Sequence, residues 1–129
     1  MSFDLPDKSL VHEELSKQII GAAMEALNEL KPGLDEKLYE NALVNELRGR
    51  GHQIEQQRSF PVAYKGTSIG TLIPDLIVDG KVIVDPKVVT AFNDSHIAQM
   101  TGYLAITGLR LALLINFKFA RLEWKRVVK

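Results

Sequence analysis

Apolar residues recur at intervals of three and four along the first part of the chain, a spacing that predicts helices. The first stripe runs from Leu10 to Leu30, and Pro32-Gly33 follows it as a helix stop. A second helix is expected from Asp35 to Arg50. The residues expected on its inward face are Leu38, Ala42, Leu43 and Leu47.

From Gln53 onward the apolar period changes to two, which is the period of β-strands. Strands are expected over residues 54–64 and 68–78, joined by a turn at Lys65-Gly66, and a third strand over 81–89. These three strands follow one another with only short turns between them. They therefore predict a meander in the middle of the chain.

Helical and strand patterns alternate again in the last third of the chain. Asn93-Asp94-Ser95 offers an N-cap to a helix that runs to Ile106. A nearly continuous apolar run over 109–117 predicts a strand covered on both faces, and 122–128 predicts a final edge strand. The predicted order is helix, helix, three strands, helix and two strands.

Acidic side chains interrupt the two apolar strands of the segment 73–87. Asp85 and Lys87 are two residues apart, so both project from one face of a strand, and Asp75 lies in the neighbouring strand. Two carboxylates and an ammonium group on one face can hold a divalent cation and activate a water beside it. The alternative is a surface hairpin with scattered charges.

The turn between these strands decides whether the two aspartates meet. A strict two-residue loop would put Asp75 and Asp85 on opposite faces of the hairpin. A three-residue loop over 78–80, with a left-handed bulge at Gly80, instead pairs Asp75 with Ile83 and gives a shared face. The metal hypothesis requires this bulged turn. The opposite, apolar face would then carry Leu76, Val78, Val82, Val84 and Val88.

Two of the predicted helices carry further polar side chains at helical spacing. Glu36 and Tyr39 are three apart on the second helix, although a carboxylate near a helix start is also a routine partner of the helix dipole. His96, Gln99 and Tyr103 form a polar stripe over successive turns of the later helix. Such a stripe indicates either a polar neighbour or a solvated face.

The overall composition narrows the classes of function. The chain has 129 residues, 16 basic and 16 acidic side chains and no cysteine, and we expect one domain over 1–129. Zero net charge counts mildly against tight nonspecific DNA binding, although 48–52 and 118–129 are locally basic. Without cysteine there is neither a disulfide nor a thiolate metal site, which fits a cytoplasmic location. No apolar run or signal pattern predicts a membrane association.

Several chemistries lack their usual sequence signals. The sequence contains no Gly-x-Ser-x-Gly elbow, no Walker-type loop and no dinucleotide fingerprint. His12 and His52 have no companions in the sequence, and both are expected at the surface. Nucleophilic catalysis and nucleotide-cofactor chemistry therefore have little support.

Three motifs together resemble a known family. Pro74-Asp75 followed by Asp85-Pro86-Lys87 resembles the signature of the PD-(D/E)XK nuclease superfamily. The segment from Gln99 to Tyr103 is similar to the Gln-x-x-x-Tyr element of its RecB-like members. The segment from Gly33 to Tyr39 matches the motif that names the GxxExxY protein family, and the resemblance covers about residues 10–128.

The resemblance implies a restriction-endonuclease-like α/β core, with a mixed central sheet flanked by helices. It also implies hydrolysis of DNA or RNA that depends on Mg²⁺ (or Mn²⁺), with Asp75, Asp85 and Glu36 around the metal. Lys87 would position or deprotonate the attacking water. The residues that it assigns to catalysis are Asp75, Asp85, Lys87, Glu36 and Gln99, with supporting roles for Tyr39, His96 and Tyr103.

The chain departs from the family pattern at Asp85-Pro86-Lys87, where the family usually shows Glu-Leu-Lys. Aspartate keeps the carboxylate but shortens its reach by one methylene. Proline removes a backbone donor and is rare inside a central strand, so a local bend is expected at Pro86. The alternative function is a catalytically inactive nuclease-like module that binds nucleic acid or protein. A homodimer is left open, because a domain this small rarely encloses duplex DNA alone.

Overall fold

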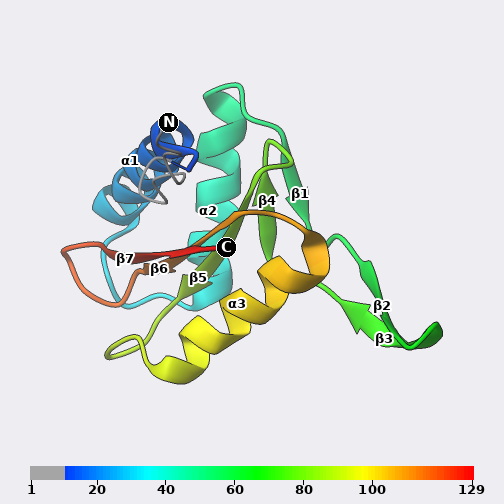
Figure 1. Ribbon diagram of the computed structural model, residues 1–129. Helices are drawn as coiled ribbons and strands as arrows, with labels where there is room; N and C mark the ends of the chain where they lie inside the picture. The colour runs from blue at the N-terminus through cyan, green and yellow to red at the C-terminus, as the bar shows by residue number, and fades with distance from the viewer. Residues whose placement is uncertain (1–10) are drawn as a thin grey trace, which may run out of the picture.

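Two helices precede the sheet in the computed structural model, which describes residues 11–129 (Figure 1). Helix α1 spans Glu13–Leu30 and α2 spans Glu36–Gly49, close to the predicted bounds. Leu10, the predicted start of the first helix, lies outside the described residues. The expected inward position of Leu38 is wrong, because half of this residue is exposed and the neighbouring Tyr39 is buried in its place.

The loop between α1 and α2 is fastened by the Tyr39 side chain. Its hydroxyl donates to the carbonyl of Lys31 at 2.6 Å and accepts from the N–H of Leu34 at 3.1 Å. The ring stacks on Phe117 with 5.0 Å between centroids. Tyr39 therefore fixes the start of α2, and with it the position of Glu36, relative to the end of the sheet.

The strands are shorter and more numerous than the sequence predicts. Each of the expected strands 54–64 and 68–78 is broken in two. Gln57 takes a left-handed conformation with φ 59°, and no strand covers Ile73-Pro74. The strands are β1 (Ile54–Gln56), β2 (Phe60–Tyr64), β3 (Thr67–Leu72), β4 (Leu76–Val78), β5 (Val82–Lys87), β6 (Leu111–Asn116) and β7 (Glu123–Val128).

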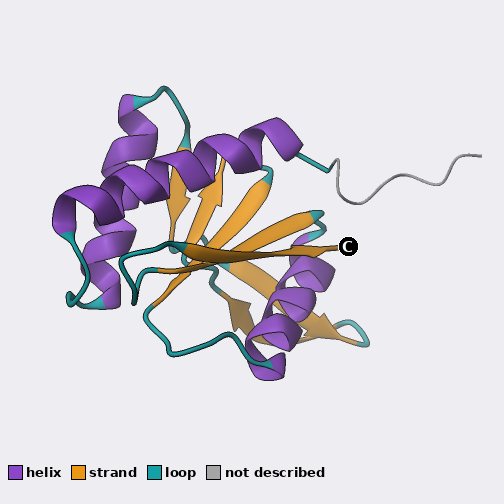
Figure 2. Ribbon diagram, turned by 90° about the vertical axis from the view of Figure 1, so that its left-hand side faces the viewer, coloured by secondary structure: helices purple, strands orange, loops and turns teal. Residues whose placement is uncertain are grey.

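Five of these strands form a mixed sheet in the order β1-β4-β5-β6-β7, in which only β5 and β6 are parallel. Strands β2 and β3 form a separate hairpin through the predicted turn at Lys65-Gly66. Helices α1 and α2 cover one face of the sheet, and α3 (Asp94–Thr107) covers the other (Figure 2). The expected mixed sheet flanked by helices is confirmed. All residues of β6 are buried, as its apolar run predicts.

The turn between β4 and β5 differs from the predicted one. Val78 pairs with Val82, so the three-residue loop covers 79–81 and the expected pairing of Asp75 with Ile83 is wrong. Asp79 and Gly80 are both left-handed, with φ 52° and 66°. The pairing moves by two positions, which leaves every side chain on its expected face. The predicted apolar face is confirmed, because its members pack in one hydrophobic cluster with α1 and α2: Leu76, Val78, Val82, Val84 and Val88.

Helix α3 has defined signals at both ends. The Asn93 side chain accepts the N–H of His96 at 2.9 Å, and Nδ1 of His96 accepts the N–H of Asn93 at 3.2 Å, which makes a capping box. Gly108 ends the helix in a left-handed conformation. Within residues 11–129, no helix is long and apolar enough to cross a membrane.

Candidate active site

Two aspartates meet where the start of β4 lies beside the end of β5. Because these strands are antiparallel, Asp75, just before β4, comes next to Asp85, near the carboxyl end of β5. Their carboxyl groups share a hydrogen bond. Nζ of Lys87 lies 3.1 Å from Oδ2 of Asp85, and both side chains are largely buried. The structure thus brings together the three side chains that the hairpin pattern singled out.

The acid pair is electrostatically crowded. The pKa of Asp75 is raised from 3.8 to about 6, first by burial, then by the hydrogen bond that its protonated carboxyl donates to Asp85 and by the negative charge of Asp85. Lys87 and Lys37 oppose this shift by their positive charges. A proton is therefore held between the carboxyl groups at mildly acidic pH. A cation bound there would replace that proton.

Glu36 is the first residue of α2 and interacts electrostatically with Lys87. Burial raises the pKa of Glu36, the Lys87 charge lowers it, and the Asp75 charge raises it. Its carboxylate also accepts the backbone N–H of Val88, which follows β5. Glu36 is thus anchored at the end of β5, within electrostatic reach of both Lys87 and Asp75.

The polar stripe of α3 divides into two parts. Nε2 of Gln99 donates to the hydroxyl of Tyr103 at 3.1 Å. Burial raises the pKa of Tyr103, and the charges of Asp85 and Asp75 raise it further, so this pair faces the acids. His96 lies at the first turn, where its ring serves the capping box and meets Phe92 edge-on. Its contacts belong to the helix cap.

Pro86 is accommodated without disturbing the central strand. The pairing of β5 with β6 continues through Pro86 and Lys87 with no register shift, so no bulge interrupts the ladder at Pro86. Phe117 donates its N–H to the carbonyl of Lys87 at 2.8 Å, so Lys87 uses its backbone on the β6 side. Successive residues of a strand direct their backbone groups to opposite sides. The backbone of Pro86 therefore faces the β4 side, beyond the point where β4 begins, and its missing N–H costs no ladder bond.

Two buried polar residues that support the site were missed by the sequence reasoning. Glu40, one turn after Glu36, is buried and accepts from Lys37 at 2.6 Å and from Gln56 at 3.0 Å. The carboxamide of Asn116 donates to the carbonyl of Val89 at 2.8 Å, which fixes the chain just after β5. Asn116 could have been found as the one polar residue that closes the apolar run.

The sequence-based prediction for His52 is wrong. His52 is not a surface residue without companions, because its Nδ1 lies 2.7 Å from Oδ2 of Asp79 and most of its side chain is buried. Asp79 also accepts the backbone N–H of Gln53 at 2.8 Å. This contact ties the end of α2 to the β4–β5 turn, at the end of the sheet opposite to the acid pair. The partners are 27 residues apart in sequence, so spacing alone gave no signal.

The donor set fits a hard divalent cation of the Mg²⁺ type. Among residues 11–129, no three carboxylate or imidazole groups gather closely enough to enclose a metal ion. Mg²⁺ does not need such a cage, because it is commonly held by one or two carboxylates and keeps waters or substrate phosphates as its other ligands. Asp75 and Asp85 supply two carboxylates, and the Glu36 carboxylate is within electrostatic reach of Asp75.

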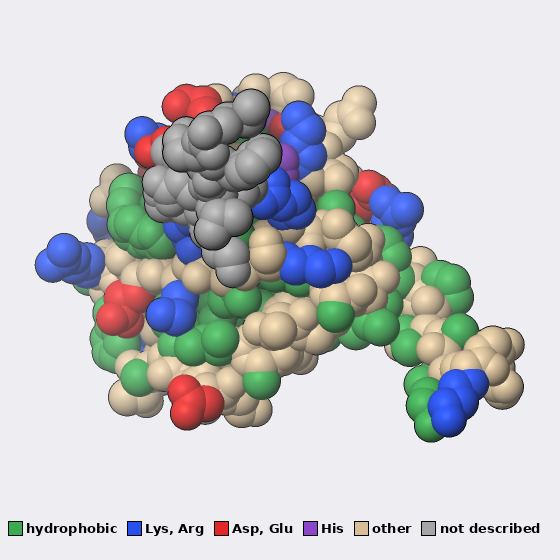
Figure 3. Space-filling view, viewed as in Figure 1, with side chains coloured by type: hydrophobic (Ala, Val, Ile, Leu, Met, Phe, Trp, Pro, Cys, Tyr) green, Lys and Arg blue, Asp and Glu red, His purple; other side chains and the backbone are tan. Residues whose placement is uncertain are grey.

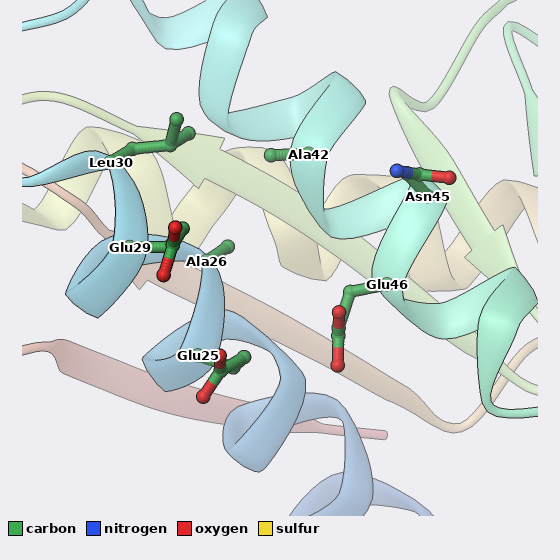
Figure 4. Close-up of a pocket in the computed structure, with 7 residues that line it drawn as sticks. All are labelled: Glu25, Ala26, Glu29, Leu30, Ala42, Asn45 and Glu46. Carbon is green, nitrogen blue, oxygen red and sulfur yellow. The ribbon is translucent and has the colours of Figure 1, made fainter.

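A groove elsewhere on the surface has a different character. It lies between α1 and α2, and three of the seven side chains that line it are glutamates (Figure 4). Its negative charge disfavours phosphate groups. The lining residues are Glu25, Ala26, Glu29, Leu30, Ala42, Asn45 and Glu46.

A mixed five-stranded sheet between helices, with an acidic pair and a lysine at the end of its central strand, defines a restriction-endonuclease-like α/β domain. A family model described as the PD-(D/E)XK nuclease superfamily matches residues 13–127. The chain therefore belongs to this superfamily, as its motifs predict. Searches among curated proteins and among solved structures found no match.

Proposed function

We propose that this domain is a nuclease that hydrolyses phosphodiester bonds of DNA or RNA with Mg²⁺ or Mn²⁺. The observation that carries the proposal is the carboxyl pair of Asp75 and Asp85 beside Lys87, in a chain of a nuclease superfamily. Crowded carboxylates that retain a proton are suited to exchange it for a cation. Membership of the superfamily supports a nucleic-acid substrate.

Each side chain has a role that follows from its place. Asp75 and Asp85 would hold the metal, which supplies a water of lowered pKa and offsets charge on the phosphate. The buried ammonium of Lys87 is placed to orient the attacking water and to stabilise negative charge on the phosphate. Glu36 would complete or orient the ligand shell from α2.

The residues of α3, and Tyr39 of α2, would act more indirectly. Gln99 and Tyr103 would brace the acid pair from the α3 side. His96 would act through the helix cap that positions this pair. Tyr39 would support the site by holding the start of α2.

Metal binding and cleavage test the proposal together. Calorimetric titration of the wild type with Mg²⁺ and Mn²⁺ should detect binding that Asp75→Ala and Asp85→Ala both lose. Lys87→Gln should keep metal binding and lower the cleavage rate by on the order of 10²-fold, since it removes one stabilising cation. Asp94→Ala, an exposed acid on α3, is the control and should resemble the wild type. Cleavage that survives Asp85→Ala would disprove the assigned site.

A catalytically silent module that binds nucleic acid or protein is the second candidate. It is favoured by Pro86, which departs from the usual family pattern between the acid and the lysine, and by the zero net charge of the chain. Nucleic-acid binding that needs no divalent cation, falls steeply with salt and leads to no cleavage would support it. Cation-dependent turnover would exclude it.

Finer assignments stay predictions. The GxxExxY resemblance of residues 33–39 would assign the chain to a narrower group, whereas the family match covers the superfamily alone. A single domain over 1–129, a homodimer and a cytoplasmic location are likewise expected on the sequence alone. Light scattering of the purified protein would test the homodimer directly.

A further inference from the structure

The β2–β3 hairpin projects from the body of the domain as a narrow arm (Figure 1). Phe60, at its base, packs against the hydrophobic cluster on the α3 face of the sheet. Farther out, Tyr64 and Ile69 leave 60% and 64% of their surface exposed. A two-stranded hairpin gains little stability by itself in water. These exposed side chains contribute little to folding, so they are available for contacts with a partner.

The arm begins and ends at the candidate active site. The chain enters it at Gln57, whose backbone N–H donates to the carbonyl of Asp75 at 3.3 Å. It returns through Leu72 at the end of β3, three residues before Asp75. A strand bound at the acid pair would therefore pass the base of the arm.

The charge of the arm suits a phosphate backbone. Between residues 57 and 74 the sequence has two cations, Arg58 and Lys65, and no acidic residue. Arg58, at the base, pairs with Glu55 at 3.3 Å, so Lys65 carries the positive charge of the outer arm. Both cations lie over aromatic rings: Arg58 over Phe60 at 4.7 Å and Lys65 over Tyr64 at 5.4 Å from the centroid. Figure 3 shows a positively charged side chain at the outer end of the arm, among hydrophobic ones. An aromatic face next to a cation is the combination that binds unpaired nucleotides, by stacking on a base and contacting its phosphate.

We propose that this hairpin is a nucleic-acid-binding arm, in which Tyr64 stacks on an unpaired base and Lys65 contacts the adjacent phosphate. The inference rests on the proposed function, because it concerns the substrate of the same site. A second copy of the chain is disfavoured as the occupant, since contact between two such arms would bring like charges together.

Fluorescence anisotropy with a single-stranded oligonucleotide, in EDTA to prevent cleavage, tests the arm. Tyr64→Ser should weaken binding by about tenfold, and Lys65→Gln should lower the slope of log affinity against log salt by about 0.7. Lys65→Arg should restore the slope. The matched control is the exposed pair on β7, changed by Trp124→Ser and Lys125→Gln, which should leave binding unchanged. Circular dichroism and thermal unfolding of each variant show that the fold is retained.

The outcomes separate the arm from the nuclease function. If the wild type binds and cleaves nucleic acid, and Tyr64→Ser and Lys65→Gln leave both activities unchanged, the hairpin is not a nucleic-acid-binding arm. The proposed nuclease function would then still stand. Loss of binding in the β7 pair alone would place the contact on that strand and also overturn the arm. A dimer that Tyr64→Ser dissociates would make the arm a contact between copies. A wild type that neither binds nor cleaves nucleic acid would overturn both proposals.

Discussion

At the scale of single residues, the site is organised around one unfavourable charge. Asp75 is pushed toward its neutral form by burial and by Asp85, and the positive charges of Lys87 and Lys37 offset this effect only in part. Such crowding is common at functional sites, where binding of a ligand relieves it. It also gives a measurable dependence of stability on pH.

Asp75→Asn should stabilise the metal-free protein at about pH 8. The pKa of Asp75 rises from 3.8 in the unfolded chain to about 6 in the folded one, so the folded state holds the proton more tightly. Stability is therefore lost as pH rises between these values, and the loss is complete above the folded pKa. After allowance for solvent screening, the gain in unfolding free energy is about 1 kcal/mol. It should vanish below about pH 4, as measured by urea unfolding in EDTA.

The opposite sign is expected for Asp79→Asn, which serves as the control. Burial of Asp79 would raise its pKa, but the hydrogen bonds from His52 and from the Gln53 N–H outweigh burial and lower it. The stability it contributes is present above its ordinary pKa and is lost as pH falls. This variant should therefore lose about 1 kcal/mol at about pH 8, the typical contribution of a hydrogen bond. Equal effects of the two substitutions would contradict the assignment of the acid pair.

At the scale of elements, the site depends on where one strand ends and where another strand and a helix begin. Strand β5 ends at Lys87, β4 begins one residue after Asp75, and α2 begins at Glu36. Helix α3 adds Gln99 and Tyr103 and is itself positioned by its N-cap. It buries Met100 and Leu104 fully, and Ile97 and Tyr103 pack partly buried against the same hydrophobic cluster.

Asn93→Ala tests the cap of α3. The change removes the side-chain acceptor for the His96 N–H and should lower the free energy of unfolding by about 1 kcal/mol. Ser95→Ala, an exposed position in the first turn, should stay within about 0.5 kcal/mol of the wild type. Unfolding can be followed by the fluorescence of the single tryptophan, Trp124. Equal stabilities of the two variants would show that the Asn93 cap does not stabilise α3.

At the scale of the whole molecule, the last strand is tied to the start of the first helix. Arg126 of β7 donates to the hydroxyl of Ser16 and to the carbonyl of Val11, both at 2.7 Å. These partners are more than a hundred residues apart in sequence. The contact joins the edge strand to the helical layer on one face of the sheet.

Arg126→Met should cost about 2–3 kcal/mol of unfolding free energy, because it removes hydrogen bonds that involve a charged group and leaves their acceptors unpaired. Lys125→Met, at the next position and exposed, should cost less than about 0.5 kcal/mol. Guanidinium unfolding of both variants measures the difference. If Lys125→Met alone lowered the free energy of unfolding, the contacts of Arg126 with Ser16 and Val11 would contribute nothing to stability.

The chain's own pattern determined much of this domain. Periodicity, Pro32-Gly33 and Asn93 located the helices to within a few residues, because these signals act locally. Strand parity separated the acidic face of the hairpin from its apolar face. The predicted faces stayed correct although the predicted turn was wrong, because a pairing shift of two positions leaves every side chain on the same face of the hairpin.

Tertiary structure alone decided the remaining features. That the β2–β3 arm leaves the five-stranded sheet was decided by packing. The breaks at its two ends did have local signals that the sequence prediction missed, because residues 55–59 are all polar and Pro74 is disfavoured inside a strand. Buried partners such as Glu40 with Gln56, and His52 with Asp79, join residues from distant segments. Local pattern records which face a side chain takes. It does not record which distant group that face meets, because that is set by the packing of helices and strands against one another.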